Sequence, residues 1–380
     1  MAFQGALGGG RGARGFASKP SRVKQTLSPL VIVPKETAAI WGGDALVLRY
    51  GKDCDPAAAI GESWECWDEN RVRGGAFDGK TIAELRAQLG PRLMGGLDPG
   101  RIFPVLTKII DARQSLSVQV HPDDAYAQRV EHQPNGKTEC WVILDAEPGA
   151  ELVLGWTQAT TREEYERRVK DGTLGDILRR VPVKPNDAFY LPSGTLHAIG
   201  AGIQLYETQQ ASDLTYRIFD WNRLGKDGKP RELHVDKAAD VLNYAAGTTA
   251  ATSHLTYETG GIAYEACIAD PRFVVEKISV RKGAAASLVP DDFPSILMTM
   301  DTPIVLSNGD QQTDLGRWTT ALIPAEVTSI AVDPEASAQA LLVTPDRATF
   351  QRRLSRSGVA NADSDRFLAQ FETHTADVVA

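Results

Sequence analysis

Short apolar runs separated by Gly, Pro and Asp dominate the chain. Most runs are rich in Val, Ile and Leu and last only a few residues, which is typical of the strands in sandwiches and barrels. The pattern predicts strands in the first part of the chain at 30–33, 45–50 and 105–110, and in the second part at 273–280, 295–302, 318–324 and 341–344. We therefore expect a mainly β fold.

Helices are expected at only a few places, where the sequence carries start signals. Thr81 with Glu84, and Thr161 with Glu164, have the spacing of a capping box, in which two side chains satisfy the free N–H groups of a helix start. Gly90 and the proline after it end the first of these helices. The sequence thus predicts short helical insertions at about 80–90 and 161–180.

A run of small and polar residues at 245–252 divides the chain and is interpreted as a linker. Strand patterns lie on both sides of it, and no repeat of about 20–50 residues indicates a solenoid or propeller. We expect two β-barrel-like halves, residues 27–245 with the helical insertions and residues 252–346. A flexible N-terminal tail at 1–26 and a polar C-terminal tail at 347–380 complete the predicted organisation.

Composition and charge exclude several classes of protein. Hydrophobic residues make up 42% and charged residues 24%, which is ordinary for a soluble globular protein. The net charge of −8 argues against a nucleic-acid partner, because proteins that bind nucleic acid usually have a basic surplus. No apolar stretch approaches the ~18 residues of a transmembrane helix, so no membrane partner is expected. The four cysteines form no CxxC pair and are too sparse for a disulfide scaffold, which predicts a reducing, cytoplasmic location.

The first 35 residues differ from the rest because they contain arginines and lysines but no acidic residue. Organellar transit peptides have this composition. A flexible tail, or a start codon assigned too far upstream, explains it as well, and we favour this second interpretation.

The candidate chemistry begins at 116–121, where apolar and polar residues alternate strictly. Because successive side chains of a strand point to opposite faces, Ser117, Gln119 and His121 share one face. Three polar groups inside a barrel would need a metal ion or ligand as partner. The alternative is an ordinary strand whose polar face lies in water.

Two later segments carry further candidate ligands. Lys137 and Glu139 share a face, and Glu139 enters a strongly apolar strand, where a carboxylate needs a cation or an ion-pair partner. Lys137 alone could be that partner. Further on, a strand runs into a Pro-Ser-Gly turn, and His197 begins the next strand. Imidazole and carboxylate groups bind zinc, so His121, Glu139 and His197 are candidate ligands, whereas Gln119 would be an unusual one.

These segments resemble a known family. The Pro-x-Gly-x-x-His sequence ending at His197 resembles the second cupin motif, although Asn186 replaces its leading Gly and Ala201 its trailing Asn. A Gln-x-His pair ending at His121 replaces the usual cupin His-x-His, and the spacing from His121 to Glu139 is long, as in type I phosphomannose isomerases. The chain is similar to the short bacterial form of that family, with further matches at 39–43, 61–64, 103–108 and 207–217.

The resemblance, dense from 30 to 242, implies cupin-like (jelly-roll) halves and one zinc ion per chain, with the ligands Gln119, His121, Glu139 and His197. It implies a substrate site that includes Ser117, Arg223 and Trp41. It places catalytic positions at Arg217, Lys137, Lys108, Glu207 and Asp213. Arg217 is assigned to charge stabilisation, because a guanidinium stays protonated, and Arg223 to the phosphate. The proton-transfer base stays open between Lys108, Lys137, Glu207 and water on the zinc.

The implied reaction is the interconversion of mannose 6-phosphate and fructose 6-phosphate through an enediol, so the expected partner is a small sugar phosphate. A cupin oxygenase is one alternative, since it binds iron with two histidines and one carboxylate. A non-catalytic sugar-phosphate-binding cupin is the other, and a lost ligand or a lost Arg217 would favour it. The second half has one histidine, His254, and no ligand set, so no separate active site is expected there. Nothing in the sequence specifies an oligomeric state.

Overall fold

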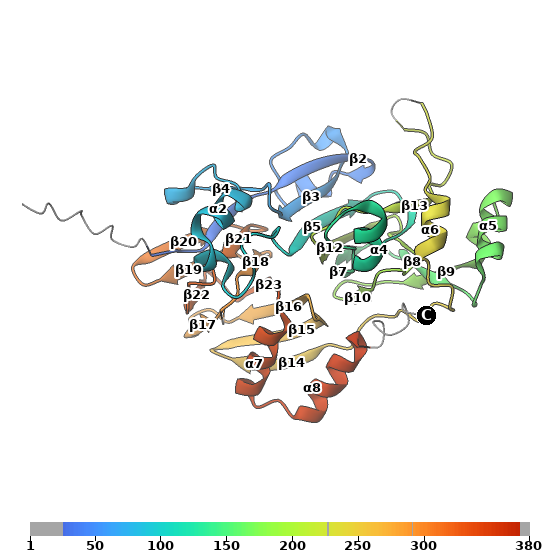
Figure 1. Ribbon diagram of the computed structural model, residues 1–380. Helices are drawn as coiled ribbons and strands as arrows, with labels where there is room; N and C mark the ends of the chain where they lie inside the picture. The colour runs from blue at the N-terminus through green and yellow to red at the C-terminus, as the bar shows by residue number, and fades with distance from the viewer. Residues whose placement is uncertain (1–25, 226–227, 291, 373–380) are drawn as a thin grey trace, which may run out of the picture.

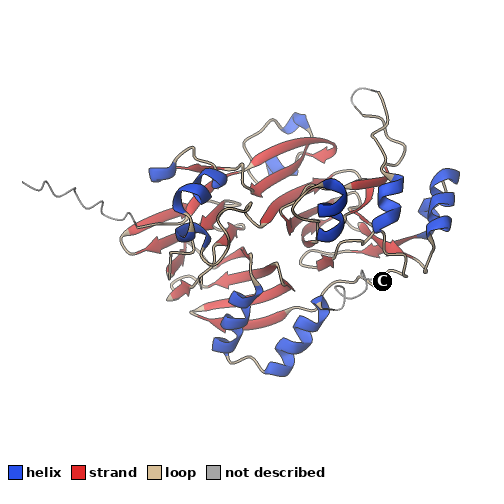
Figure 2. Cartoon of the chain, viewed as in Figure 1, coloured by secondary structure: helices blue, strands red, loops and turns tan. Residues whose placement is uncertain are grey.

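The computed structural model describes residues 26–225, 228–290 and 292–372 (Figure 1). Strands form the interior of the molecule, and most helices lie at its periphery (Figure 2). The described residues form four sheets, whose ladders are antiparallel. The mainly β fold predicted from the sequence is confirmed.

Two of the sheets pack face to face around the candidate chemistry. The six-stranded sheet has the order β10 (Ala188–Leu191), β7 (Glu139–Ala146), β12 (Ile203–Gln210), β5 (Val105–Ala112), β2 (Lys35–Gly43) and β3 (Ile60–Cys66). The five-stranded sheet has the order β13 (Tyr216–Phe219), β6 (Val118–Val120), β11 (His197–Ala198), β8 (Glu151–Trp156) and β9 (Leu178–Pro182). One buried apolar cluster joins Ile110 and Trp141 of the first sheet to Leu152 and Leu154 of the second. Burial of these side chains holds the two layers together.

The other two sheets contain the strands of the second half. The eight-stranded sheet has the order β14 (Leu255–Thr259), β15 (Ile262–Asp270), β16 (Phe273–Val280), β23 (Ala338–Thr344), β18 (Ser295–Thr299), β21 (Thr320–Ile323), β1 (Leu30–Val33) and β4 (Arg71–Arg73). The four-stranded sheet has the order β17 (Ala286–Leu288), β22 (Ile330–Pro334), β19 (Ile304–Asn308) and β20 (Gln311–Leu315). The strands predicted at 273–280, 295–302, 318–324 and 341–344 are therefore confirmed within a few residues.

The first described strand, β1, belongs to the eight-stranded sheet and not to the two sheets of the first half. In β1, Leu30 pairs with Leu322 and Val31 with Ala321 of β21. Leu30 and Ile32 are buried in the core that the second half shares. The N-terminal segment thus extends across the boundary that the linker suggested, because β1 pairs with β21 of the second half on one side and with β4 of the first half on the other.

Helices and helical turns connect the strands. Those of the first half are α1 (Ala45–Leu48), η1 (Pro56–Ala58), η2 (Gly75–Phe77), α2 (Ile82–Leu89), α3 (Pro91–Met94), α4 (Asp124–Tyr126), η3 (Ala127–Glu131), α5 (Arg162–Asp171), η4 (Leu174–Ile177) and α6 (Val235–Val241). The two predicted helical insertions are confirmed, and Thr81 and Thr161 cap them. The strand predicted at 45–50 was wrong. Leu46 and Tyr50, four residues apart, are both buried, which is the spacing of a helical face.

The polar tail predicted at 347–380 was wrong for its described part. The helices α7 (Arg347–Ser357) and α8 (Asn361–Leu368) and the turn η5 (Ala369–Phe371) cover β14 and β15 (Figure 1). Phe350, Leu354 and Phe367 of these elements are buried in the core of the second half. Charged residues separate these apolar positions in the sequence, so the apolar face of the helices was not recognised. Residues 373–380, and all but one residue of the tail predicted at 1–26, lie outside the described residues.

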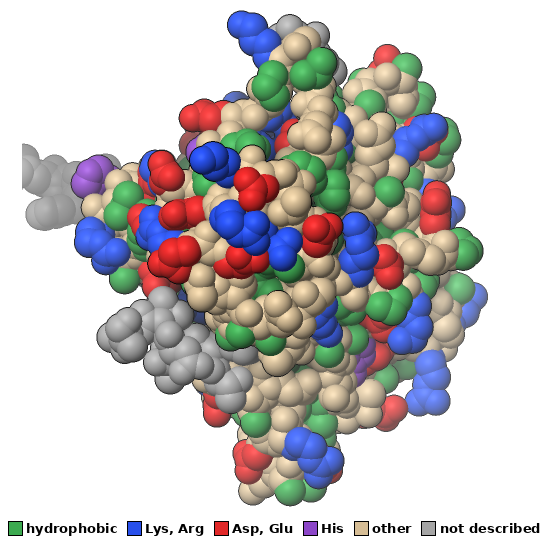
Figure 3. Space-filling model, turned by 90° about the vertical axis from the view of Figure 1, so that its right-hand side faces the viewer, with side chains coloured by type: hydrophobic (Ala, Val, Ile, Leu, Met, Phe, Trp, Pro, Cys, Tyr) green, Lys and Arg blue, Asp and Glu red, His purple; other side chains and the backbone are tan. Residues whose placement is uncertain are grey.

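In the described ladders, no sheet closes from its first strand to its last. The linker predicted at 245–252 contains no named helix or strand, and its Ala246 forms an isolated bridge with Trp156. None of the described helices is long and apolar enough to cross a membrane. On the face shown in Figure 3, acidic and basic side chains are interspersed.

Candidate active site

Three potential metal ligands meet between the two packed sheets. His121 follows β6, Glu139 begins β7 and His197 begins β11. One donor atom from each lies within 4.8 Å of the others, and each residue is at most 2% exposed. Two imidazoles and one carboxylate are the donors that zinc and several other divalent metals bind. The structure therefore brings together three of the four predicted ligands as a possible metal site.

Backbone carbonyls orient both histidines toward the centre of this site. Nδ1 of His121 lies 2.8 Å from the carbonyl oxygen of Leu214, and Nδ1 of His197 lies 2.8 Å from that of Thr195. A carbonyl only accepts hydrogen bonds, so each Nδ1 carries the proton and each Nε2 keeps a lone pair. Nε2 of His121 lies 3.6 Å from one Glu139 oxygen, and Nε2 of His197 lies 3.2 Å from the other. Burial lowers the pKa of both imidazoles, which keeps them neutral and able to bind a cation.

Gln119, the fourth predicted ligand, lies beside this cluster. It is directly opposite His197 in the ladder between β6 and β11, and it lines a cavity that adjoins the three ligands. Directly opposite residues of neighbouring strands have their Cβ atoms about 4.5–5.5 Å apart. The placement is compatible with a ligand role, which stays a prediction.

A lysine ammonium lies among the ligand atoms. Nζ of Lys137 is 2.7 Å from Oε2 of Glu139 and 3.3 Å from Nε2 of His121. Burial alone would lower the pKa of Lys137, but Glu139 and Glu207 outweigh this effect and raise it. The ion pair that the sequence left as an alternative for Lys137 is thus present. It also shows that the ligand atoms form a pocket that attracts positive charge.

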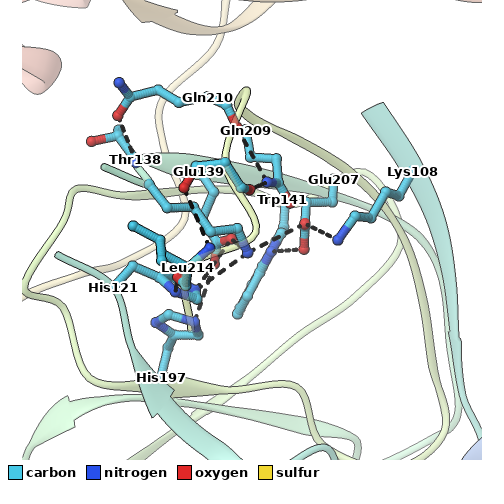
Figure 4. A network of polar contacts seen from close by, with 12 residues as sticks. Lys108, His121, Thr138, Glu139, Trp141, His197, Glu207, Gln209, Gln210 and Leu214 are labelled. Carbon is cyan, nitrogen blue, oxygen red and sulfur yellow. Dashed lines mark hydrogen bonds and ion pairs between the residues drawn. The ribbon is translucent and has the colours of Figure 1, made fainter. Parts of the chain in front are cut away.

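Buried charges continue from this point along the six-stranded sheet (Figure 4). Oε1 of Glu207 lies 3.6 Å from Nζ of Lys137 and 3.4 Å from Nζ of Lys108, and Nε1 of Trp141 donates to Oε2 at 3.2 Å. Lys108 has a second carboxylate, that of Glu62, at 3.5 Å. Burial would raise the pKa of Glu207, but the two lysines outweigh it and lower that pKa. Glu207 is therefore an ionised carboxylate between two ammonium groups.

A cavity of about 310 Å³ is lined by Lys137 and Gln119, which neighbour the three ligands, although none of the three ligands lines it. It is lined by most of the predicted site, namely Trp41, Lys108, Ser117, Gln119, Lys137, Glu207, Asp213 and Arg217. Glu62 and Arg231 line it too, and the sequence-based interpretation had assigned no role to either. Polar groups of both charges surround a volume suited to a small polar molecule.

Arg217 and Arg223 occupy different places. Arg217 lies on β13 directly opposite Gln119, and its Nη1 donates to the carbonyl oxygen of Glu232 at 3.0 Å. Burial, followed by the nearby charge of Arg231, lowers the pKa of Arg217. Arg223 instead pairs with Asp220 at 2.6 Å and is not among the residues that line the cavity. Arg223 follows Arg217 by six residues, an even spacing that would place both on one face of a continuous strand, but β13 ends at Phe219.

Comparison with known proteins places this site in a family. The family model "Phosphomannose isomerase type I, catalytic domain" matches residues 32–161. A mannose-6-phosphate isomerase of Streptococcus mutans is 39% identical over 254 residues, which cover 66% of this chain and 78% of that protein. The mannose-6-phosphate isomerase ManA of Bacillus subtilis is 46% identical over 221 residues, covering 57% of this chain and 69% of the relative.

Solved structures agree with these relatives. A crystal structure of the mannose 6-phosphate isomerase from Bacillus subtilis has a TM-score of 0.77 and 32% identity, and the match covers 83% of this chain and 99% of that one. The resemblance identified from Gln119, His121 and Glu139 is therefore confirmed. This chain belongs to the type I mannose-6-phosphate isomerase family, a family of isomerases.

Proposed function

We propose that this protein interconverts mannose 6-phosphate and fructose 6-phosphate with the help of one zinc ion. Gln119, His121, Glu139 and His197 would hold the ion. The observation that carries the proposal is the buried His121–Glu139–His197 cluster, whose Nε2 lone pairs face a carboxylate beside a polar cavity. Within the described residues no hydrogen bond engages Nε2 of His197, and Glu139 has Lys137 as its ion-pair partner, so these side chains keep lone pairs that suit a metal ion.

The reaction moves a proton between C2 and C1 of the sugar through an enediol. The proton beside a carbonyl is only weakly acidic, so the negative charge that develops on oxygen must be stabilised in place. When bound, zinc would supply Lewis-acid stabilisation of that charge. The side chains of the cavity must supply binding, orientation and proton transfer.

Arg217 is the group we assign to charge stabilisation at the reacting end. It lies opposite Gln119, next to the ligands, and Nε of its half-buried guanidinium has no hydrogen-bond partner within the described chain. A fixed donor of this kind stabilises a developing oxyanion without reorganisation. Ser117 and Trp41, which line the same cavity, would contact the sugar and limit the access of water.

Glu207 is the group we assign to proton transfer. The candidates left open by the sequence include two lysines, but nearby carboxylates raise the pKa of both Lys108 and Lys137, so that neither accepts a proton readily. The carboxylate of Glu207 lines the cavity in its ionised form, so it is the group of this set that can accept a proton, although its lowered pKa makes it a weaker base than a free carboxylate. Lys108 and Lys137 would then stabilise the charged carboxylate and the sugar oxygens.

We further propose that the first half is cupin-like and that the second half is structural. The ligands come from facing sheets and point into the space between them, as expected of a cupin interior. In the described chain, His121, Glu139 and His197 form the one cluster of three potential donors. His254, the only histidine of the second half, is 2.7 Å from Glu265, which explains its presence without a metal.

A coupled assay with mannose 6-phosphate, combined with metal analysis of the purified protein, tests the proposal. We expect isomerase activity that chelation abolishes and zinc restores. The iron oxygenase alternative predicts iron in the protein and no isomerase activity, and the non-catalytic alternative predicts sugar-phosphate binding without turnover.

A further inference from the structure

Two arginines share one buried carboxylate next to the cavity. Nε and Nη2 of Arg231 donate to the two oxygens of Asp220 at 2.7 and 2.6 Å, and Nη2 of Arg223 donates to one of them at 2.6 Å. The Asp220 side chain is only 6% exposed. Burial would raise its pKa, but Arg231 and Arg223 outweigh this effect and lower it. Asp220 therefore holds both guanidinium groups in fixed positions.

Only one of these arginines faces the cavity. Arg231 is among the lining residues, together with Ser117, Lys137 and Arg217, and Arg223 is not. Arg231 uses one edge of its guanidinium for Asp220, and no hydrogen bond engages its Nη1 among the described residues. A guanidinium has five N–H donors, so an edge of Arg231 is left for an anion.

The contacts between neighbouring strands connect Arg231 to β13, which lies two strands away from His197 of β11. His197 lies opposite Gln119, and Gln119 lies opposite Arg217. Arg217 in turn donates to the carbonyl oxygen of Glu232, the neighbour of Arg231. A hexose 6-phosphate carries its reacting carbons at one end and its phosphate at the other. With C1 and C2 beside the ligands, the phosphate points toward Arg231.

The balance of charge favours a dianion at this end. Near the metal ligands, both lysines of the cavity are paired with carboxylates. At the other end, Arg223 and Arg231 pair with the single buried carboxylate of Asp220, and Arg217 lies near enough for its charge to interact with those of Arg231 and Asp220. The carboxylates of Asp213 and Glu232 are exposed, and no ion pair within 4.0 Å joins either to these arginines in the described part of the chain. A phosphate group, with about two negative charges, would balance the excess.

We propose that Arg231, rather than Arg223, binds the phosphate of the substrate, and that Asp220 and Arg223 position it. The proposal rests on the proposed function for the identity of the substrate, but the anion site itself can be tested without turnover. Arg223 is here a positioning residue that shares the charge of Asp220.

The test compares three variants with the wild-type protein. Arg231→Gln removes the proposed phosphate ligand, and Arg223→Gln removes the other partner of Asp220. Arg86→Gln is the matched control, because Arg86 donates from Nε and Nη2 to both oxygens of Asp68 as Arg231 does to Asp220, but it does not line the cavity. For each protein we would measure kcat and KM for mannose 6-phosphate, metal content, thermal stability and the affinity for inorganic phosphate by calorimetry.

We expect Arg231→Gln to raise KM for mannose 6-phosphate and the Kd for inorganic phosphate by about 10-fold to 100-fold, the effect of one lost charge-assisted contact. Its kcat should change by no more than about threefold, because the phosphate is bound equally in ground state and transition state. Arg223→Gln should raise both constants by less than Arg231→Gln, and Arg86→Gln should change neither.

A rise in KM and Kd at Arg223→Gln that equals or exceeds that at Arg231→Gln would overturn the proposal. So would equal changes in all three variants, which would indicate lost stability alone. If Arg231→Gln does not fold, Arg231→Lys takes its place: it keeps the charge but cannot form the two-point contact with Asp220, and we expect a smaller rise in the same two constants. Unchanged constants in that variant would contradict the assignment. Phosphate binding that depends on Arg231 in a protein without isomerase activity would refute the proposed reaction and leave the anion site standing.

Discussion

The assignment of proton transfer to Glu207 makes a specific prediction for Glu207→Gln. The substitution keeps the shape of the side chain and its contact with Trp141, but it removes the charge and the capacity to accept a proton. General acid–base catalysis contributes a factor of about 10²–10⁴, so we expect kcat to fall by that amount. The bound metal should be retained, because Glu207 is not among the three clustered ligands.

The effect on folding should be smaller than for an ordinary buried pair. Removal of one partner of a buried ion pair costs about 3–5 kcal/mol when the other charge is left alone. Here Lys137 keeps Glu139 at 2.7 Å, and Lys108 keeps Glu62 at 3.5 Å. We therefore expect a loss of about 1–3 kcal/mol, which a domain of ordinary stability tolerates.

Glu62→Gln provides the control, because it removes the other carboxylate beside Lys108 without touching Glu207. The Glu62 side chain is 22% exposed, so the loss of its charge should cost about 1 kcal/mol or less. This free energy corresponds to a change in kcat of no more than about fivefold. Steady-state kinetics, urea unfolding and metal analysis of both variants decide the matter. Equal loss of kcat in the two variants, or a kcat of Glu207→Gln within tenfold of wild type, would refute the assignment.

Three further outcomes are expected. Arg217→Gln should lower kcat by about 10²–10³-fold with little change in KM, and an effect confined to KM in steady-state kinetics would contradict its role in charge stabilisation. In chelated protein, the native pKa values of His121 and His197 lie below those of the unfolded chain, so their contribution to stability is complete above about pH 6.5 and is lost as pH falls. Urea unfolding at pH 7, 6 and 5 should show this loss, with a slope of up to about 2.7 kcal/mol per pH unit, and a flat profile would disprove it. Arg353→Met should lower the free energy of unfolding by about 3–5 kcal/mol, because Glu276 would stay buried without its ion-pair partner. The kcat per folded molecule should stay the same. Urea unfolding and steady-state kinetics measure both quantities, and an unchanged free energy of unfolding would show that the ion pair is dispensable.

The sequence predicted best what depends on local pattern. Strict alternation put Gln119 and His121 on one face, and capping boxes located the helices that begin after Thr81 and Thr161. The ligand set came from a resemblance in which order and spacing of separated segments agree. Periodicity could not show that His197 lies opposite Gln119, because that pairing joins strands distant in the chain.

The misses have two physical causes. The run at 45–50 is too short for its apolar residues to distinguish a strand from a helix. Arg353 was assigned to a polar tail, but it is buried and forms an ion pair with Glu276, a residue far away in the sequence. Arg231 lies in a segment without regular periodicity, and only the fold reveals that Asp220 turns it toward the cavity side. Pairing between distant charges is not encoded in local pattern.

The most direct test of the central claim is the isomerase activity of the same protein sample before chelation, after chelation and after the return of zinc. We predict one equivalent of metal per chain, activity on mannose 6-phosphate that disappears with the metal, and recovery when one equivalent of zinc binds. The variant His197→Ala should neither bind the metal nor recover. Full activity in the metal-free protein would contradict the account.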